Sequence, residues 1–151
     1  IYSDSEVMKY MNSIPESIER EEENIRNHIH HYYENLGFGL WAVILKSSQK
    51  LIGRCGLLQH TLNEHKEVEI SYLLAQKYWG KGYAREAGFA VIAFAFERLK
   101  LNRLIAFVNP NNIASVNLAK RLGFSFESKI EYKSYGLVDL YVKRAPSTDS
   151  I

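Results

Sequence analysis

The chain has 151 residues, 46% of them hydrophobic and 24% charged, and its formal net charge at pH 7 is +2. This length suits one globular domain with a sizeable core, and so small a charge gives no reason to expect nucleic acid as a partner. No apolar run approaches the roughly 18 residues of a membrane span, and Ile1 to Glu6 lacks the basic and apolar parts of a signal peptide, so no membrane partner is expected.

Two helices are expected first. Residues 4–11 have one apolar face and a Ser or Asp cap at the start. After a break at residues 12–15, a longer helix should run from Ser17 to about Asn35. Three isoleucines are predicted to face inward: Ile18, Ile25 and Ile29. Three glutamates lie near its start, where the helix dipole favours negative charge: Glu21, Glu22 and Glu23. They form either a solvated face or the rim of a cleft that attracts an amine.

Strands follow. Three antiparallel strands are expected, over residues 40–45, 51–59 and 68–74. Gly53 and Gly56 within the second strand suggest a bulge or a close backbone approach. Cys55 is the only cysteine, which excludes an internal disulfide and fits a reducing cytoplasm. In a strand-like segment it is expected to fill the core rather than act as a nucleophile.

The stretch 68–87 predicts a strand, a glycine loop and the start of a helix. Gly80 and Gly82 follow the strand, and the helix over 83–98 has an apolar stripe. Glycines let an anion approach the unpaired N–H groups at a helix start, so a phosphate site is predicted, with a plain tight turn as the alternative. The loop is neither a P-loop nor a dinucleotide fingerprint, because Arg85 stands where the third glycine would be.

The remaining chain continues an α/β pattern. Residues 103–108 should form a strand parallel to 68–74, because a crossover helix connects them. A turn-rich segment over 109–115 leads to a helix that ends at Gly123. A final hairpin is expected over residues 125–132 and 137–143. The predicted fold is a mixed, mostly antiparallel sheet with flanking helices in a single domain over residues 1–144, followed by a polar tail over 145–151 that is expected to be disordered.

Two motifs resemble the GNAT superfamily of acyl-CoA-dependent N-acetyltransferases, and in particular its ribosomal-protein N-terminal acetyltransferase branch. The family loop, Arg/Gln-x-x-Gly-x-Gly/Ala, corresponds to residues 79–84, and the branch form Gly-Lys-Gly-Tyr-Ala-x-Glu-Ala to residues 80–87. The branch signatures Pro-x-Asn-x-x-Ser and Lys-x-Leu-Gly-Phe correspond to residues 110–115 and 120–124. The resemblance covers nearly the whole chain and implies that a first strand and the start of the first helix should precede Ile1.

The resemblance implies acetyl-CoA as cosubstrate and no metal. The pyrophosphate would lie on the loop amides, and the pantetheine would pair with backbone exposed where residues 106–108 separate from the strand 68–74. The residues implied in coenzyme binding are Leu73, Leu74, Trp79, Gly80, Lys81, Gly82, Tyr83, Ala84, Asn112 and Ser115.

Acetyl transfer needs a base for the amine, a donor for the developing oxyanion and a proton for the thiolate. Glu69 lies at the family's carboxylate position and is either the base or a surface carboxylate; the backbone N–H of Leu73 or Leu74 is the implied oxyanion donor. The family's acidic tyrosine is replaced by Ala119, so Ser115 is either the substitute donor or a helix cap. Trp79 replaces the usual Arg or Gln, which removes one polar phosphate contact.

These residues predict an N-acetyltransferase acting on a primary amine, either a protein N-terminus or a small molecule, as a cytoplasmic monomer or homodimer. The amine should enter opposite the coenzyme, between the acidic helix and the turn 132–136. The residues predicted to bind it are Glu21, Glu22, Glu23, Tyr132 and Tyr135. A non-catalytic acyl-CoA sensor and a protein-interaction module are the alternatives.

Overall fold

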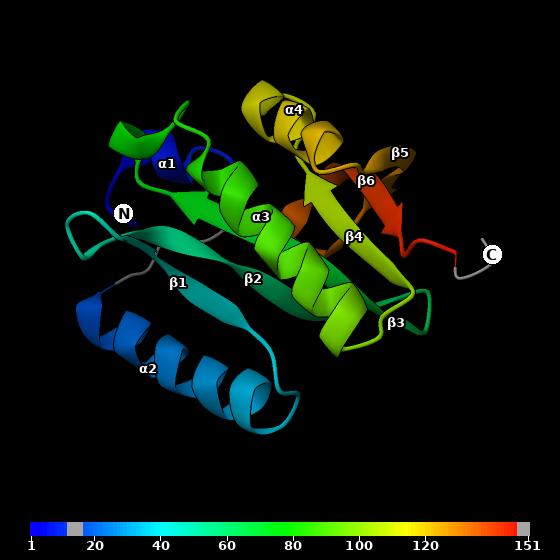
Figure 1. Ribbon diagram of the computed structural model, residues 1–151, viewed down its shortest axis with the longest axis horizontal. Helices are drawn as coiled ribbons and strands as arrows, with labels where there is room; N and C mark the ends of the chain where they lie inside the picture. Colours follow the sequence, from blue (N-terminus) through cyan, green and yellow to red (C-terminus); the bar gives the residue numbers. More distant parts are fainter. Residues whose placement is uncertain (12–16, 148–151) are drawn as a thin grey trace.

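The computed structural model describes residues 1–11 and 17–147. The six strands form one sheet in the order β1-β2-β3-β4-β6-β5, in which β3 and β4 are parallel and every other neighbouring pair is antiparallel (Figure 1). The elements are α1 (Ser5–Met8), α2 (Ile18–His28), η1 (Ile29–Glu34), β1 (Leu40–Leu45), β2 (Lys50–Leu62), β3 (His65–Leu74), η2 (Gln76–Tyr78), α3 (Tyr83–Ala93), η3 (Phe94–Arg98), β4 (Arg103–Val108), α4 (Ile113–Arg121), β5 (Ser125–Glu131), η4 (Lys133–Tyr135) and β6 (Leu137–Arg144). The predicted α/β fold with a mixed sheet is confirmed.

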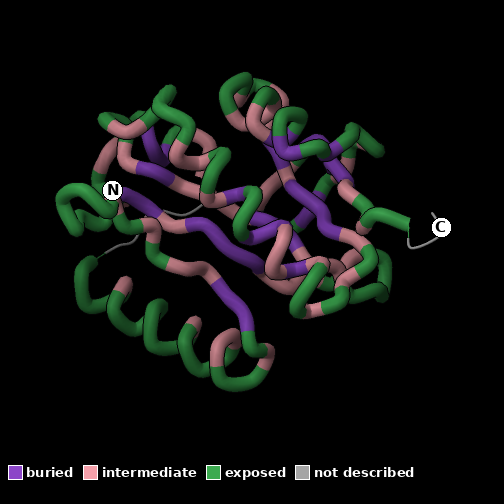
Figure 2. The backbone as a smooth tube through the Cα atoms, viewed as in Figure 1, coloured by how far each residue is buried: buried purple, intermediate pink, exposed green. Residues whose placement is uncertain are grey.

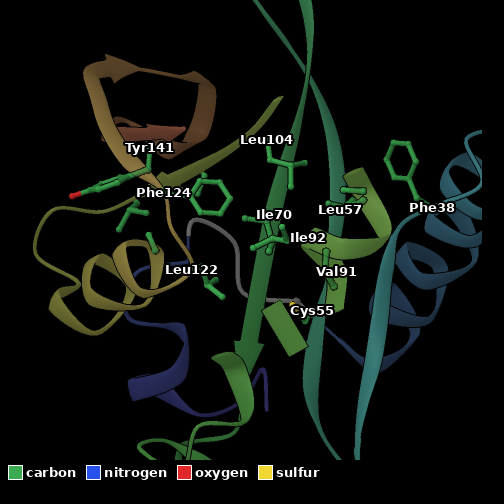
Figure 3. Close-up of a cluster of buried hydrophobic side chains, with 14 residues drawn as sticks. Phe38, Cys55, Leu57, Ile70, Val91, Ile92, Leu104, Leu122, Phe124 and Tyr141 are labelled. Atoms are coloured by element: carbon green, nitrogen blue, oxygen red, sulfur yellow. The ribbon is translucent and has the colours of Figure 1, made fainter. Parts of the chain in front are cut away.

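The main core lies between α3 and the sheet. Figure 1 shows α3 crossing β2 and β3, and Figure 3 shows the apolar side chains of this core, among them Val91 of α3, Leu57 of β2 and Ile70 of β3. Gly88 lets α3 and α4 approach each other, because a Cβ there would lie 2.8 Å from Cδ1 of Leu122. Cys55 belongs to the same cluster, as predicted, and is buried.

The predicted glycine roles are confirmed at three positions. A Cβ on Gly53 would lie 2.1 Å from the Leu73 carbonyl oxygen, and one on Gly56 would lie 2.1 Å from the Gly39 oxygen, so both sit where backbones approach closely. Gly123 ends α4 with φ +87°. There the Gly123 and Phe124 amides donate to the Lys120 and Ala119 carbonyls, which is the Schellman arrangement.

The long N-terminal helix is correctly placed, but its predicted inward face is wrong. Ile18, Ile25 and Ile29 are 76%, 51% and 41% exposed. The reason is position: α2 lies beside the edge strand β1 instead of over the sheet, and its surface is mostly exposed (Figures 1 and 2). Its far end is fixed at Leu40, whose N–H donates to Nε2 of His28 at 2.9 Å and whose carbonyl accepts from the Tyr33 hydroxyl.

The N-terminal helix α1 is shorter than the predicted 4–11 and ends at Met8. Its Asp4 cap is confirmed, because Oδ1 accepts from the Glu6 amide at 3.0 Å. The predicted break at residues 12–15 and the end of the predicted disordered tail lie outside the described residues.

Candidate functional site

Strand β3 directs polar side chains to both faces of the sheet, because successive residues of a strand point in opposite directions. Tyr72 pairs with Cys55 and lies on the face covered by α3, whereas Glu69 pairs with Leu58 and lies on the other face. We call these the coenzyme face (Tyr72) and the acceptor face (Glu69). Along the described chain, β3 pairs with β4 only between Glu69 and Ile105, so the backbone of β3 beyond Glu69 has no ladder partner on that side.

On the acceptor face, Glu69 is 4% exposed, and the alternative that it is a surface carboxylate is wrong. Its Oε2 lies 2.7 Å from Nε2 of His60 on β2. Burial raises the pKa of the Glu69 carboxyl, while the hydrogen bond from His60 and one from the Phe107 backbone lower it. The carboxyl is therefore held by specific donors in a site that otherwise disfavours its charge.

Aromatic rings enclose this pair. The ring centroids of Phe107, Tyr132 and Tyr135 lie 5.2, 5.6 and 6.3 Å from that of His60. Tyr132 is buried and stacks on Phe107 at 4.9 Å. Burial, followed by the nearby Glu69 carboxylate, raises the pKa of Tyr135 to about 12. The predicted acceptor tyrosines are thus brought together with the predicted base.

The backbone at the end of β3 separates the two oxyanion candidates. The Ala75 amide donates to the Ile52 carbonyl of β2. The Leu73 carbonyl also faces β2, at Gly53. Because backbone groups alternate in direction along a strand, the Leu74 N–H points toward β4 and the Leu73 N–H toward β2. Leu74 is therefore the better placed donor for a ligand lying between β3 and β4.

The glycine loop is open. Gly80 and Gly82 have φ angles of +72° and +86°, and a Cβ on either would meet no heavy atom within 4 Å. Gly82 is the N-cap of α3, and among the described residues no side chain caps that helix start. The first amides of α3 are therefore available to an anion, and the loop residues suit a pyrophosphate. Lys81 is exposed beside this helix start.

The indole of Trp79 holds the glycine loop in place. Its Nε1–H donates to the Leu74 carbonyl at 2.8 Å, which fastens the loop to the end of β3. Tyr83 packs edge-on against Tyr78 with the ring centroids 6.3 Å apart, and Lys81 lies 5.8 Å over the Tyr78 ring. Ala84 follows in the first turn of α3 and is half-buried.

On the coenzyme face, the Ser115 hydroxyl lies 3.0 Å from the Tyr72 hydroxyl. The cap of α4 is Asn112, whose Oδ1 accepts from the Ser115 amide at 3.1 Å, so the alternative that Ser115 is itself the cap is wrong. Burial raises the pKa of Tyr72 to about 12, while the hydrogen bond with Ser115 lowers it. A phenol with that pKa remains protonated, so Tyr72 can donate to Ser115 and leave the seryl hydrogen for another acceptor.

The ion pairs and hydrogen bonds of the acidic run lie within α2. Glu22 and Glu23 are paired within α2, with Arg26 at 3.8 Å and Arg20 at 2.7 Å, and Glu21 accepts from Asn24. The end of the helical region nearest Glu69 carries Tyr32 instead, since the Glu69 carboxylate contributes to the raised pKa of that tyrosine. Glu21 lies eleven residues earlier, about 16 Å along a helix.

Sequence reasoning missed three contributors: His60, Tyr72 and Phe107. Each belongs to a strand that was correctly predicted or nearly so, but their meeting depends on the register of β2 with β3 and of β3 with β4. The available signal was the alternation of β3, which places Tyr72 and Glu69 on opposite faces.

Comparison with known proteins places this geometry in a family. Residues 1–125 match the acetyltransferase (GNAT) domain. The chain is 34% identical over 144 residues to an uncharacterized N-acetyltransferase p20 of Bacillus licheniformis, covering 93% of this chain and 80% of that protein. A solved structure of a putative ribosomal-protein-serine acetyltransferase from Vibrio cholerae superposes with a TM-score of 0.71 at 25% identity, over 86% of this chain and 76% of that one. A spermidine N-acetyltransferase from Vibrio cholerae superposes with a TM-score of 0.68 at 25% identity, over 85% and 74% of the two chains.

Two features are absent from residues 1–11 and 17–147. No helix in this part of the chain is long and apolar enough to cross a membrane. No group of three or more His, Cys, Asp or Glu side chains within it is placed to hold a metal ion.

Proposed function

This chain belongs to the acetyltransferase (GNAT) family and is an acyltransferase, and we propose that it transfers the acetyl group of acetyl-CoA directly to a primary amine, with Glu69 as the base. The observation that carries the proposal is the buried Glu69 carboxylate, held by His60 at the point where β3 and β4 separate. A carboxylate with a raised pKa inside an aromatic enclosure is suited to take a proton from an ammonium group.

The glycine loop supplies the coenzyme site. The amides from Gly80 to Ala84 would hold the pyrophosphate, Lys81 would add a positive charge, and the exposed backbone of Leu73 and Leu74 would line the pantetheine. Acetyl-CoA supplies the activated acyl group. Support comes from the open space over Gly80 and Gly82 and from the uncapped start of α3, within the described residues.

The residues of this chain divide the proton transfers. Glu69 takes the proton that the attacking nitrogen releases, and the Leu74 N–H donates to the carbonyl oxygen while the C–S bond breaks. The Ser115 hydroxyl gives its proton to the departing sulfur and is resupplied through Tyr72 or solvent. Asn112 holds Ser115 in place through its backbone amide.

For the acceptor, we propose a protonated primary amine bound against Tyr132 and Tyr135, since aromatic faces beside a carboxylate favour a cation. Both a protein N-terminus and a polyamine fit this description. The loop and helix motifs favour the ribosomal-protein N-terminal acetyltransferase branch, and similarity to a putative ribosomal-protein-serine acetyltransferase supports it. Similarity to spermidine N-acetyltransferases supports a polyamine as the second candidate.

The test is an acceptor screen with acetyl-CoA, in which released thiol is measured for N-terminal peptides, polyamines and other small amines. Burial raises the pKa of Cys55 to about 12, so the folded protein should contribute no thiol signal of its own. Amine-dependent thiol release, with the acetylated amine confirmed by mass, is the expected result. Coenzyme A binding without transfer to any amine would instead identify a sensor, and absence of binding would favour an interaction module.

A further inference from the structure

His60 has no role in the transfer steps above, yet its Nε2 lies 2.7 Å from Oε2 of the base. We propose that His60 is the positioning residue of Glu69: its Nε2–H holds Oε2, keeps the buried carboxylate ionised and leaves Oε1 free to take the proton of the acceptor amine. This inference rests on the proposed function of Glu69 as base.

With Glu69 ionised, as proposed, the contact requires the imidazole proton on Nε2. An ionised carboxylate can only accept hydrogen bonds, so a separation of 2.7 Å between Oε2 and Nε2 places the hydrogen on Nε2. The other nitrogen, Nδ1, faces the Tyr132 hydroxyl at 3.5 Å, and that hydroxyl also lies 3.2 Å from the Thr61 carbonyl, to which it donates. Because the Tyr132 hydrogen is given to Thr61, the contact that holds the carboxylate is the one between Nε2–H and Oε2.

Burial makes this donor important. The side chains of His60 and Glu69 are only 11% and 6% exposed, so water cannot replace the bond if the imidazole is removed. Edge contacts with the Phe107, Tyr132 and Tyr135 rings fix the plane of the imidazole and hence the direction of Nε2–H. The ring therefore orients the carboxylate as well as stabilising its charge.

Other groups act on the pair from every side. Arg54 on β2 lowers the pKa of Glu69, in the same direction as His60 but after it in size. Tyr32 of η1 and Tyr135 of η4 lie near the carboxylate, whereas Tyr72 lies on the opposite face of β3. Lys133 lies 5.1 Å over the Tyr132 ring. The tyrosines remain neutral below about pH 10, the ordinary value for a phenol, so Arg54 is the charged group that could substitute for His60. Arg54 makes no direct hydrogen bond to Glu69 among the contacts of the described residues.

Two substitutions separate hydrogen bonding from packing. In His60→Met, a flexible apolar side chain fills the space without a donor, whereas in His60→Gln an amide N–H can reach Glu69 without the imidazole. We expect the acid limb of the kcat/KM pH profile to move to higher pH by about one unit or more in His60→Met, the size of shift that a lost charge-stabilising partner produces. In His60→Gln the limb should stay within about 0.3 unit of wild type, a small fraction of that shift. The acetyl-CoA KM should be unchanged in both.

The profile should be repeated with acceptors of different basicity, because only a titration of the enzyme stays in place when the amine changes. An acid limb that does not move in a folded His60→Met protein overturns the proposal, and so does a limb that moves equally in both variants.

A titration of the Glu69 carboxyl group tests the role of His60 without enzymatic turnover. With ¹³C-labelled glutamate, the Glu69 carboxyl resonance, assigned by its loss in Glu69→Gln, should titrate at higher pH in His60→Met than in wild type and near wild type in His60→Gln. If no amine is acetylated, the proposed function fails while this titration still decides the role of His60. Equal titration midpoints in wild type and His60→Met would show that the imidazole only fills space.

Discussion

The two faces of strand β3 carry different chemistry, although the residues concerned are only three positions apart. On the acceptor face, the Glu69 carboxyl group is buried among aromatic rings and lies 2.7 Å from His60. On the coenzyme face, two neutral hydroxyls, those of Tyr72 and Ser115, meet at 3.0 Å. An incoming ammonium must lose a proton and a departing thiolate must gain one, so a base and a donor are needed on opposite sides of the reacting carbon. The alternation of one strand supplies this separation.

The largest loss of activity is expected from removing the carboxylate of Glu69. Glu69→Gln should lower kcat by about 10²–10⁴-fold, the usual contribution of a general base, and should leave the acetyl-CoA KM unchanged. Steady-state kinetics with the best acceptor measure both constants. A decrease below about threefold, small beside that range, would remove Glu69 from the base role.

Thermal unfolding is the control for this variant. Because burial raises the pKa of Glu69 above its ordinary value of 4.5, the stability that this group contributes is present below that value and is lost as the pH rises through the folded-state pKa. Glutamine does not titrate, so Glu69→Gln should unfold at the same temperature as wild type or higher at pH 8. A lower unfolding temperature would mean that lost activity reflects lost structure.

The next largest effect should lie at the glycine loop, on the coenzyme side. Gly82→Glu places a carboxylate where the pyrophosphate is expected, and like charges about 4 Å apart repel by ~1–4 kcal/mol, so coenzyme A affinity should fall by about tenfold or more. Calorimetry measures it. Gly37→Glu is the matched control, because Gly37 has a similar φ of +73° and an equally open Cβ direction but lies between η1 and β1. Equal losses in both variants would assign the effect to backbone strain.

The hydroxyl pair on the coenzyme face should matter less. Tyr72→Phe removes one hydrogen bond of about 0.5–1.5 kcal/mol, so kcat should fall by about two- to tenfold. In Ser115→Ala kcat should fall further, but it should remain higher than in Glu69→Gln. Tyr141→Phe removes a hydroxyl from the same hydrophobic cluster and serves as the control. If Ser115→Ala changes only coenzyme affinity, the hydroxyl positions the thioester and donates no proton.

The sequence predicted what depends on local pattern. The alternation of residues 68–74, the glycines at 80 and 82 and the Gly123 stop of α4 each follow from backbone preferences of a few neighbouring residues, and the structure confirms these elements. The strand 103–108 was also bounded correctly from its β-rich residues, and the crossover helix before it predicted its parallel direction.

The predictions that failed concern features that depend on long-range packing. The isoleucines of α2 have helical spacing, but spacing does not reveal whether a helix covers a sheet or lies beside its edge. Glu69 alternates with apolar residues and so resembles a solvated position, yet the segment around η4 and the end of η1 cover that face. His60 could be paired with Glu69 only once the register of β2 and β3 was known.

The smallest effect is expected from neutralising the acidic run of α2. This change tests how far the acceptor site extends along that helix. Changing Glu21, Glu22 and Glu23 together to Gln removes three charges that lie about 14–16 Å along the helix from Tyr32, beyond the screening distance of about 8 Å at physiological ionic strength. The acceptor KM should therefore change by less than about twofold, and any change should shrink as salt is added. Tyr135→Leu should raise the acceptor KM more, because it removes an aromatic face near Glu69. A large, salt-dependent increase in KM for the triple variant would instead extend the acceptor site along α2, as a long polycationic acceptor would require, whereas a short N-terminal amine would leave the acidic run untouched.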